Sequence, residues 1–335
     1  MAVPLIELKH VSVTFTRGLP FRRQRVQAVV DVSLTIGEGE IIALVGESGC
    51  GKTTLGRVVV GLQRPTAGTV LYYGRDVRSL RGEDAREYRR NIQIVHQDSY
   101  AALNPVRTIY HSLSAPFLRY KLARNGREAR EKVAELLETM GLTPPGDFID
   151  KYPHQLSGGQ RQRVVLARAV AVQPKLIVAD EPVSMIDVSL RLSILDLMRS
   201  LNEKFGIAFL YITHDLATAR YFVRTGRIAV MYLGQMVEVG NLQSVLSRPR
   251  HPYLQALLSA VPVPDPRRAR SAKPLPLRSL DLPDPTKPPS GCRFHPRCPY
   301  AEDICAAEDP PLKSLTNEHR VACHLVEKIP QWVQL

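Results

Sequence analysis

Residues 46–53 read Gly-Glu-Ser-Gly-Cys-Gly-Lys-Thr, which fits the pattern G-x-x-x-x-G-K-[ST] of a phosphate-binding loop. In such a loop the glycines let backbone N–H groups close around phosphates, while the lysine reaches the terminal phosphates and the hydroxyl reaches Mg²⁺. The apolar run 41–45 predicts a buried parallel strand before the loop, and residues 54–61 continue at helical spacing. A helix N-terminus is therefore expected directly after the loop, where backbone dipoles attract anions.

The composition is typical of a soluble globular protein. The chain has 335 residues, enough for one large domain with an appendage or for two domains, and 44% of them are hydrophobic. No apolar run approaches the roughly 18 residues that cross a bilayer, and no secretory signal pattern begins the chain. We therefore expect a cytosolic protein with reduced cysteines. The net charge of +13 comes with no recognised nucleic-acid module, so no nucleic-acid partner is expected.

The order of predicted elements is that of an α/β protein with two additions. Alternating apolar and β-branched residues predict N-terminal strands at 6–8, 11–15, 32–36 and 69–73, with an irregular basic segment over 17–27. Apolar residues at helical spacing from about 101 to 155 predict an inserted helical subdomain. The remaining strands are expected at 91–95, 176–179, 207–213, 228–231 and 236–239, and the remaining helices at 161–172, 189–205 and 215–223.

Polar side chains follow three of these strands. Asp180 and Glu181 follow the strand at 176–179, and this pair suits one carboxylate that holds Mg²⁺ and one that orients or deprotonates a water. His214 and Gln97 each lie just beyond another strand. Because ligands gather beyond the carboxyl ends of parallel strands, we expect these four side chains to converge on one γ-phosphate. Taken alone, each of these four residues could instead have only a structural role at the end of its strand.

The stretch Leu-Ser-Gly-Gly-Gln at 156–160 decides between P-loop families. Read alone, it is a helix start capped by Ser157, with paired glycines that admit a phosphate. Between the phosphate loop and the Asp180–Glu181 pair, it makes residues from about 5 to 260 resemble the nucleotide-binding subunit of an ABC transporter. The resemblance implies an α/β P-loop NTPase fold with an N-terminal antiparallel β subdomain, an inserted helical subdomain and a small cysteine-rich C-terminal extension.

The same resemblance implies roles for particular residues. Glu181 would be the general base and His214 a γ-phosphate contact, while Gln97 would contact Mg²⁺ or the attacking water and sense a membrane partner. Phe15 would stack on adenine. Asp187 would cross the dimer interface. The expected nucleotide contacts are Phe15, Gly46, Ser48, Gly49, Gly51, Lys52, Thr53, Thr54, Gln97, Asp180, Asp187 and, completing the opposite subunit's site in trans, Ser157, Gly159 and Gln160. The expected Mg²⁺ ligands are Thr53, Gln97 and Asp180.

The C-terminal third narrows the family further. The segment Arg250-His251-Pro252-Tyr253 and the cysteine-containing run 292–299 resemble the extension of oligopeptide/dipeptide importer ATPases. This implies a motor subunit that couples ATP hydrolysis to peptide uptake at the cytoplasmic face of the membrane. Its implied partners are a second ATPase subunit, expected to be a paralogue, two transmembrane permease subunits and an extracytoplasmic binding protein.

Other functions remain open at this point. Related importers carry oligosaccharides, nickel or glutathione, so the resemblance does not fix the cargo. A soluble ABC ATPase of repair or translation is a weaker alternative. Such proteins usually carry two cassettes or a long coiled-coil insertion, and this sequence shows neither. A third alternative is a binding module in which the cysteine-rich unit senses iron or redox state.

The last 75 residues divide into a linker and a cysteine-rich unit. Nine prolines between Pro262 and Pro289 predict an extended linker or wrapped arm over 261–291, between an ATPase domain at 1–260 and an extension at 292–335. The extension holds Cys292, Cys298, Cys305 and Cys323, whose spacing lacks the C-x-x-C pair common in zinc sites. Four thiolates suit either Zn²⁺ or a [4Fe–4S] cluster, with unligated thiols as the remaining alternative. The resemblance to importer ATPases favours the cluster.

Overall fold

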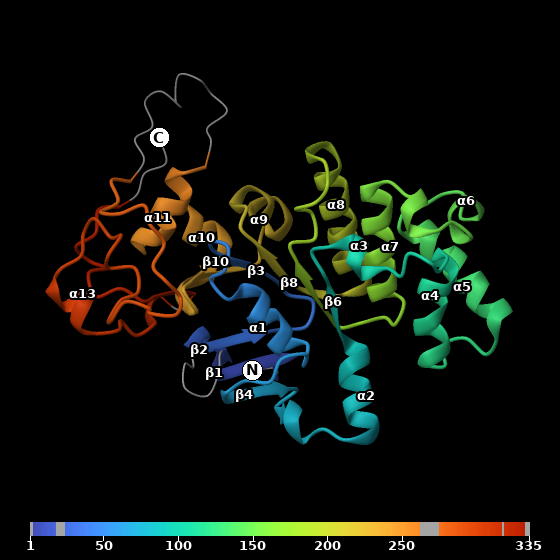
Figure 1. The fold of residues 1–335 in the computed structure, drawn as a ribbon, viewed down its shortest axis with the longest axis horizontal. Helices are drawn as coiled ribbons and strands as arrows, with labels where there is room; N and C mark the ends of the chain where they lie inside the picture. The colour runs from blue at the N-terminus through green and yellow to red at the C-terminus, as the bar shows by residue number, and fades with distance from the viewer. Residues whose placement is uncertain (1–2, 18–23, 262–274, 317, 332–335) are drawn as a thin grey trace.

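The computed structural model describes residues 3–17, 24–261, 275–316 and 318–331, arranged around a central sheet (Figure 1). In the described part of the chain this sheet has eight strands in the order β11-β12-β10-β9-β3-β8-β7-β6. Five neighbours run parallel: β9 (Arg227–Tyr232), β3 (Ile41–Val45), β8 (Ala208–Thr213), β7 (Leu176–Asp180) and β6 (Ile92–Val95). Their carboxyl ends therefore meet at one edge of the sheet.

The central strands are apolar because both faces of the sheet are covered. All residues of β7 and β8 are buried, which explains their near-continuous apolar sequences. Successive side chains enter opposite cores: Ile177 packs in one hydrophobic cluster and Val178 in the other. This burial fixes the strand register, and the register fixes where the polar residues after each strand emerge.

A second, antiparallel sheet forms the N-terminal subdomain. Its strand order is β2-β1-β4-β5, from β1 (Ile6–Arg17), β2 (Gln24–Ile36), β4 (Ala67–Tyr72) and β5 (Arg75–Asp76). This confirms the predicted antiparallel subdomain. The prediction of irregular structure over 17–27 is wrong at residue 17 and at residues 24–27, because pairing between β1 and β2 extends β1 to Arg17 and β2 back to Gln24. Residues 18–23 of that segment lie outside the described residues.

The inserted helical subdomain lies at one end of the molecule, and the C-terminal helix α13 (Asp303–Ala307) lies at the other (Figure 1). The helices of the inserted subdomain are α3 (Ser99–Ala102), α4 (Ile109–Arg119), α5 (Gly126–Thr139) and α6 (Gly146–Ile149). In α5, Asn125 caps the first turn, and Gly141 follows the last turn with a φ of 71°. The prediction of helical structure in this region is confirmed, and α7 (Gly158–Val170) leads back to the core.

The other helices cover the main sheet or follow its last strands. They are α1 (Lys52–Val59), α2 (Gly82–Asn91), α8 (Val188–Phe205), α9 (Leu216–Val223), α10 (Leu242–Ser247) and α11 (Pro252–Ser259). No sequence pattern predicted α2 or α10. Among the helices in the described ranges, none is long and apolar enough to cross a bilayer.

The C-terminal extension, by which we mean the described residues 275–316 and 318–331, continues the main sheet. Its strand β12 (His319–Val321) pairs antiparallel with β10 (Gln235–Asn241) and with β11 (Lys313–Thr316). Phe294 is 1% exposed and belongs to the same hydrophobic cluster as the sheet. The extension is therefore packed against the core through both backbone pairing and side chains. The first part of the predicted linker, 262–274, lies outside the described residues.

Candidate active site

A cleft of about 630 Å³ opens at the carboxyl edge of the parallel strands. It is lined by every residue of the phosphate loop and helix start, 46–54, together with Gln97, Glu181 and His214. The strand ends explain this convergence, since the loop follows β3, Glu181 follows β7 and His214 follows β8. Of the four side chains predicted to converge, Gln97, Glu181 and His214 line this cleft, whereas Asp180 lies behind the wall and contacts Thr53.

The conformation of the phosphate loop requires glycine at two positions. Gly46 has a φ of 156° and Gly51 a φ of 106°, values that side-chain-bearing residues rarely adopt. A Cβ at Gly46 would lie 2.1 Å from the Met231 carbonyl oxygen, and one at Gly51 would lie 2.0 Å from that of Ala28. The loop therefore fits closely between the end of β9 and the first half of β2.

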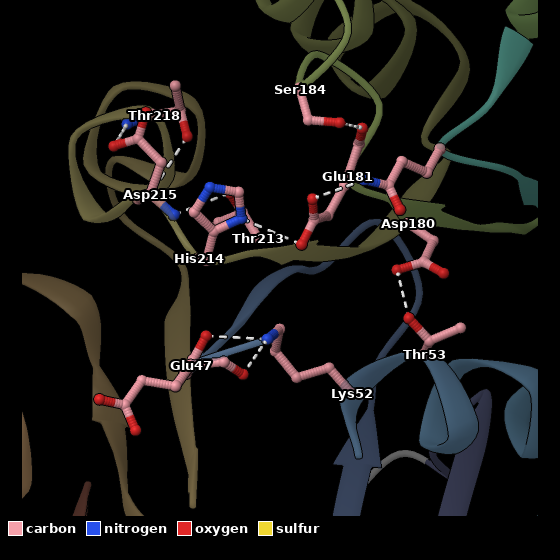
Figure 2. A network of polar contacts seen from close by, with 12 residues as sticks. Glu47, Lys52, Thr53, Asp180, Glu181, Ser184, Thr213, His214, Asp215 and Thr218 are labelled. Carbon is pink, nitrogen blue, oxygen red and sulfur yellow. Dashed lines mark hydrogen bonds and ion pairs between the residues drawn. The ribbon is translucent and has the colours of Figure 1, made fainter. Parts of the chain in front are cut away.

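Lys52 is turned towards the loop that precedes it. Its Nζ donates hydrogen bonds to the carbonyl oxygens of Gly46 and Glu47, both at 2.8 Å, and the residue is 5% exposed (Figure 2). An ammonium group held this way at the floor of the cleft is a fixed positive charge, suited to bind phosphate oxygens through charge-assisted hydrogen bonds.

Thr53 and Asp180 bring two oxygen donors together beside the phosphate loop. The Thr53 hydroxyl donates to Asp180 Oδ1 at 3.1 Å, and burial raises the pKa of the Asp180 carboxyl (Figure 2). Mg²⁺ prefers hard oxygen ligands from one or two side chains, with phosphates and waters completing its shell. A hydroxyl and a carboxylate at this position therefore fit Mg²⁺ bound with a nucleotide.

Glu181 is held in a strained and well-defined position. Its φ is 47°, an uncommon value for a non-glycine residue, and such strain is often found at functional sites. Gln97 Nε2 donates to Glu181 Oε2 at 3.1 Å, and His214 Nδ1 lies 3.0 Å from Glu181 Oε1. Figure 2 shows the Glu181 carboxylate between His214 and Asp180. The arrangement places the Glu181 carboxylate in the cleft wall, with each of its oxygens at hydrogen-bond distance from a neighbouring side chain.

Several expected nucleotide contacts do not line this cleft. Phe15 lies on β1 and is 42% exposed, outside the set of residues that form the cleft wall. The other expected contacts that are absent from the wall are Asp180, Ser157, Gly159, Gln160 and Asp187. Ser157 instead caps α7: its Oγ accepts from the Gln160 N–H at 3.3 Å, and Gln160 Oε1 accepts from the Ser157 N–H at 3.0 Å.

Other parts of the wall were not found from the sequence. They are the start of β2 at 26–28, the hairpin turn Leu233–Gly234, Leu257 in α11, and Pro285, Pro288 and Arg293 in the C-terminal extension. No local motif marks these positions. The sequence signals near these positions are the segments 250–253 and 292–299, the second of which contains Arg293, and both indicate a family resemblance but no place in the cleft.

The structure shows what the segment 250–253 does. His251 is 1% exposed, its N–H donates to the fully buried Glu238 at 2.8 Å, and its Nδ1 accepts from the Tyr253 N–H, capping α11. The Tyr253 hydroxyl in turn accepts a 2.7 Å hydrogen bond from the N–H of Glu47 in the phosphate loop. The segment therefore links α11 to the phosphate loop.

His251→Asn is expected to remove an acid sensitivity of the fold. Burial lowers the pKa of His251 to about 3, so the unfolded chain, with a histidine pKa near 6.5, binds the proton more tightly. The stability from a neutral His251 is therefore present above pH 6.5 and is lost as the pH falls towards 3. Between pH 7 and pH 5 the loss is about 2 kcal/mol.

Asparagine at this position can still cap the helix but does not titrate. Urea unfolding at pH 7 and pH 5 measures the difference, with the variant losing about 2 kcal/mol less than the parent protein over this interval. Equal pH dependence in the two proteins would show that His251 does not control it.

The four C-terminal cysteines lie near one another as free thiols. Burial raises the pKa of Cys292 to about 12 and that of Cys323 to about 11, and in both cases the neighbouring thiols add to the shift. In the described ranges, however, no group of three or more histidine, cysteine or acidic side chains has an arrangement that could hold a metal ion. The structure therefore does not support the predicted cluster, although it brings the four thiols into one neighbourhood.

A phosphate loop after β3, a carboxylate pair at the end of β7 and Leu-Ser-Gly-Gly-Gln at the start of α7 define the class of ATP-binding cassettes. Comparison with known proteins agrees. The family model described as ABC transporter matches residues 29–184, and that of the oligopeptide/dipeptide transporter C-terminal region matches 237–305. A dimeric ATP-binding cassette in a post-hydrolysis state with ADP and Pi has a TM-score of 0.62 and 32% identity, covering 71% of this chain and 98% of that one.

Two curated relatives span nearly the whole chain. The oligopeptide transport ATP-binding protein AppF of Bacillus subtilis is 44% identical, over 96% of this chain and 97% of that protein. The di/tripeptide transport ATP-binding protein DppF of Pseudomonas aeruginosa is 41% identical, over 96% of each. The chain belongs to the ABC transporter family as an ATP-hydrolysing subunit, within the group that carries the oligopeptide/dipeptide transporter C-terminal region.

Proposed function

We propose that this chain is the motor subunit of a peptide importer, which couples ATP binding and hydrolysis to uptake through a membrane permease. The observation that carries the enzymatic part is the convergence of Lys52, Thr53 and Glu181 on one cleft, with Asp180 hydrogen-bonded to Thr53 behind its wall. Peptides are the proposed cargo because the relatives are named for peptide transport and share the C-terminal region. Oligosaccharides, nickel and glutathione are the alternative cargoes.

In the proposed reaction, Lys52 leaves the loop carbonyls and binds phosphate oxygens, while Thr53 and Asp180 would hold Mg²⁺. When bound, Mg²⁺ supplies positive charge to the phosphate oxygens. Glu181 accepts a proton from the attacking water, and Gln97 and His214 hold its carboxylate in place for that transfer. His214 also contacts the γ-phosphate. These roles agree with the geometry, in which both Glu181 oxygens have partners at hydrogen-bond distance.

We further propose that the active form is a dimer of ATPase subunits bound to two permease subunits at the cytoplasmic face of the membrane, supplied by an extracytoplasmic binding protein. Ser157, Gly159, Gln160 and Asp187 would serve the partner's nucleotide, because they lie outside this chain's own cleft. Gln97 and the segment 101–110 would face a permease loop. Gln97 contacts Glu181, and the segment that follows it leads into the helical subdomain, so this stretch connects the active site with that subdomain.

Purification from the native membrane tests this assignment. We expect the tagged chain to copurify with a permease pair, and its ATPase activity to rise when a peptide-loaded binding protein is added to the reconstituted complex. Parallel additions of oligosaccharide, nickel or glutathione test the alternative cargoes. ATPase activity that responds to nucleic acid instead, with no copurifying permease, would point to a soluble ABC ATPase.

We retain a metal centre at Cys292, Cys298, Cys305 and Cys323 as a proposal, supported only by the nearness of the four thiols. Anaerobically purified protein is expected to be brown, to contain iron and acid-labile sulfide, and to lose its colour in Cys298→Ser with nucleotide binding retained. A colourless anaerobic preparation with one zinc per chain would favour the alternative ion. A preparation with neither metal would leave the thiols unligated.

A further inference from the structure

The phosphate loop is held from outside by the C-terminal extension. Glu47, the second residue of the loop, directs its carboxylate away from Lys52 (Figure 2). That carboxylate accepts two hydrogen bonds from Arg297, at 2.9 Å from Nη1 to Oε2 and 3.1 Å from Nη2 to Oε1. The Arg297 side chain is 8% exposed and that of Glu47 25% exposed. Such a two-point arginine–carboxylate pair fixes orientation as well as distance.

A second contact holds the same loop residue from the same side. The backbone N–H of Glu47 donates to the hydroxyl of Tyr253, whose ring packs against Tyr232 at 4.5 Å and against Phe294 at 5.5 Å between centroids. Phe294 belongs to the same turn as Arg297, whose N–H donates to the Phe294 carbonyl at 3.0 Å. One buried aromatic cluster therefore positions both groups that contact Glu47.

The extension also forms part of the cleft wall itself. Arg293 donates to the Leu233 carbonyl and, at 2.6 Å, to the Gln27 side chain, and all three residues line the cleft. Pro285 and Pro288, from the region predicted to be a linker, line it as well. Arg293 is only 8% exposed, so its charge is held at the wall rather than in open solvent.

We propose that the C-terminal extension shapes the nucleotide site. In this proposal Arg297 is a positioning residue that fixes the conformation of the phosphate loop through Glu47. Arg293 fixes the adjoining wall of the cleft. The proposal rests on the nucleotide site described under the proposed function. Its ligand is a nucleoside triphosphate. Because Glu181, Gln97 and His214 follow β7, β6 and β8 and do not belong to the extension, the extension acts on nucleotide binding and leaves the chemical step unchanged.

The test compares four variants of the full chain: Arg297→Lys, Arg297→Ala, Glu47→Gln and the double variant Arg297→Ala/Glu47→Gln. Glu47→Gln removes the charge but keeps the backbone N–H that reaches Tyr253. We expect each single change to raise both the Kd for a fluorescent ATP analogue and the KM for ATP by about tenfold, with kcat within about twofold of the parent. The double variant should be no weaker than Arg297→Ala, because both changes break the same pair.

Arg278→Ala is the matched control: the Arg278 side chain donates to the Ala301 carbonyl, and its backbone N–H, which donates to the Arg297 carbonyl at 3.1 Å, is kept in the variant. It should leave Kd and KM unchanged. If Arg297→Ala does not fold, Arg297→Lys and Glu47→Gln still test the proposal, because both retain the volume of the side chain. Unchanged Kd and KM in these two folded variants, or additive effects in the double variant, would overturn the inference. A parent protein that binds no ATP analogue would instead contradict the proposed function.

Discussion

Glu181→Gln is expected to reduce ATP turnover by at least about a hundredfold while leaving ATP bound. The amide has the shape of the carboxylate and can still hydrogen-bond a water, but it cannot accept the proton. Its neighbours also remain in place, since Gln97 and His214 can each keep one contact to the new side chain. With binding intact and hydrolysis blocked, the variant should accumulate as a dimer with ATP at the interface. Phosphate release and size-exclusion chromatography with ATP measure the two effects.

Lys52→Ala provides the comparison for this variant. It removes the ammonium at the floor of the cleft and should weaken ATP binding itself, so neither turnover nor ATP-dependent dimers are expected. The two variants therefore lose activity for different reasons, and a fluorescent ATP analogue distinguishes them. Turnover of Glu181→Gln at the parental rate would show that another group accepts the proton.

The parts of the site that could be predicted from the sequence are those determined by local pattern. The phosphate loop, the carboxylates after β7 and the cap of α7 each occupy a few consecutive residues whose chemistry and spacing are specific. The strands between them were found because burial on both faces makes them continuously apolar. Their parallel order then predicted that Gln97, Glu181 and His214 would meet.

The parts that were missed depend on contacts without local pattern. In α2, only Tyr88 and Asn91 are buried, so its sequence lacks apolar residues at helical spacing. The early start of β2 is decided by its partner strand. The contacts of Glu47 with Tyr253 and Arg297 join residues 206 and 250 positions apart, and neither arginine nor glutamate at such positions is distinctive by itself. Proline density predicted an extended chain over 261–291 but could not show that Pro285 and Pro288 line the cleft.

Gly158→Glu is expected to abolish most ATPase activity without disturbing the fold of the single chain. A Cβ at Gly158 would meet no atom within 4 Å, and an acidic residue in the first turn of α7 is favourable to the helix. If this helix start faces the partner's nucleotide, however, the new carboxylate faces a triphosphate. Like charges opposed across an interface cost several kcal/mol, so ATPase activity should fall at least about tenfold and ATP-dependent dimers should disappear.

Gly146→Glu is the matched control, because Gly146 also begins a helix, α6 of the inserted helical subdomain, and also has open space around its Cβ. It should retain full activity, and both variants should bind the fluorescent ATP analogue with the parental affinity, since neither residue lines the cleft. The parent's specific activity should also rise with protein concentration as dimers form. Full activity in Gly158→Glu, or specific activity that stays constant down to concentrations at which the protein is monomeric, would mean that each chain completes its own site.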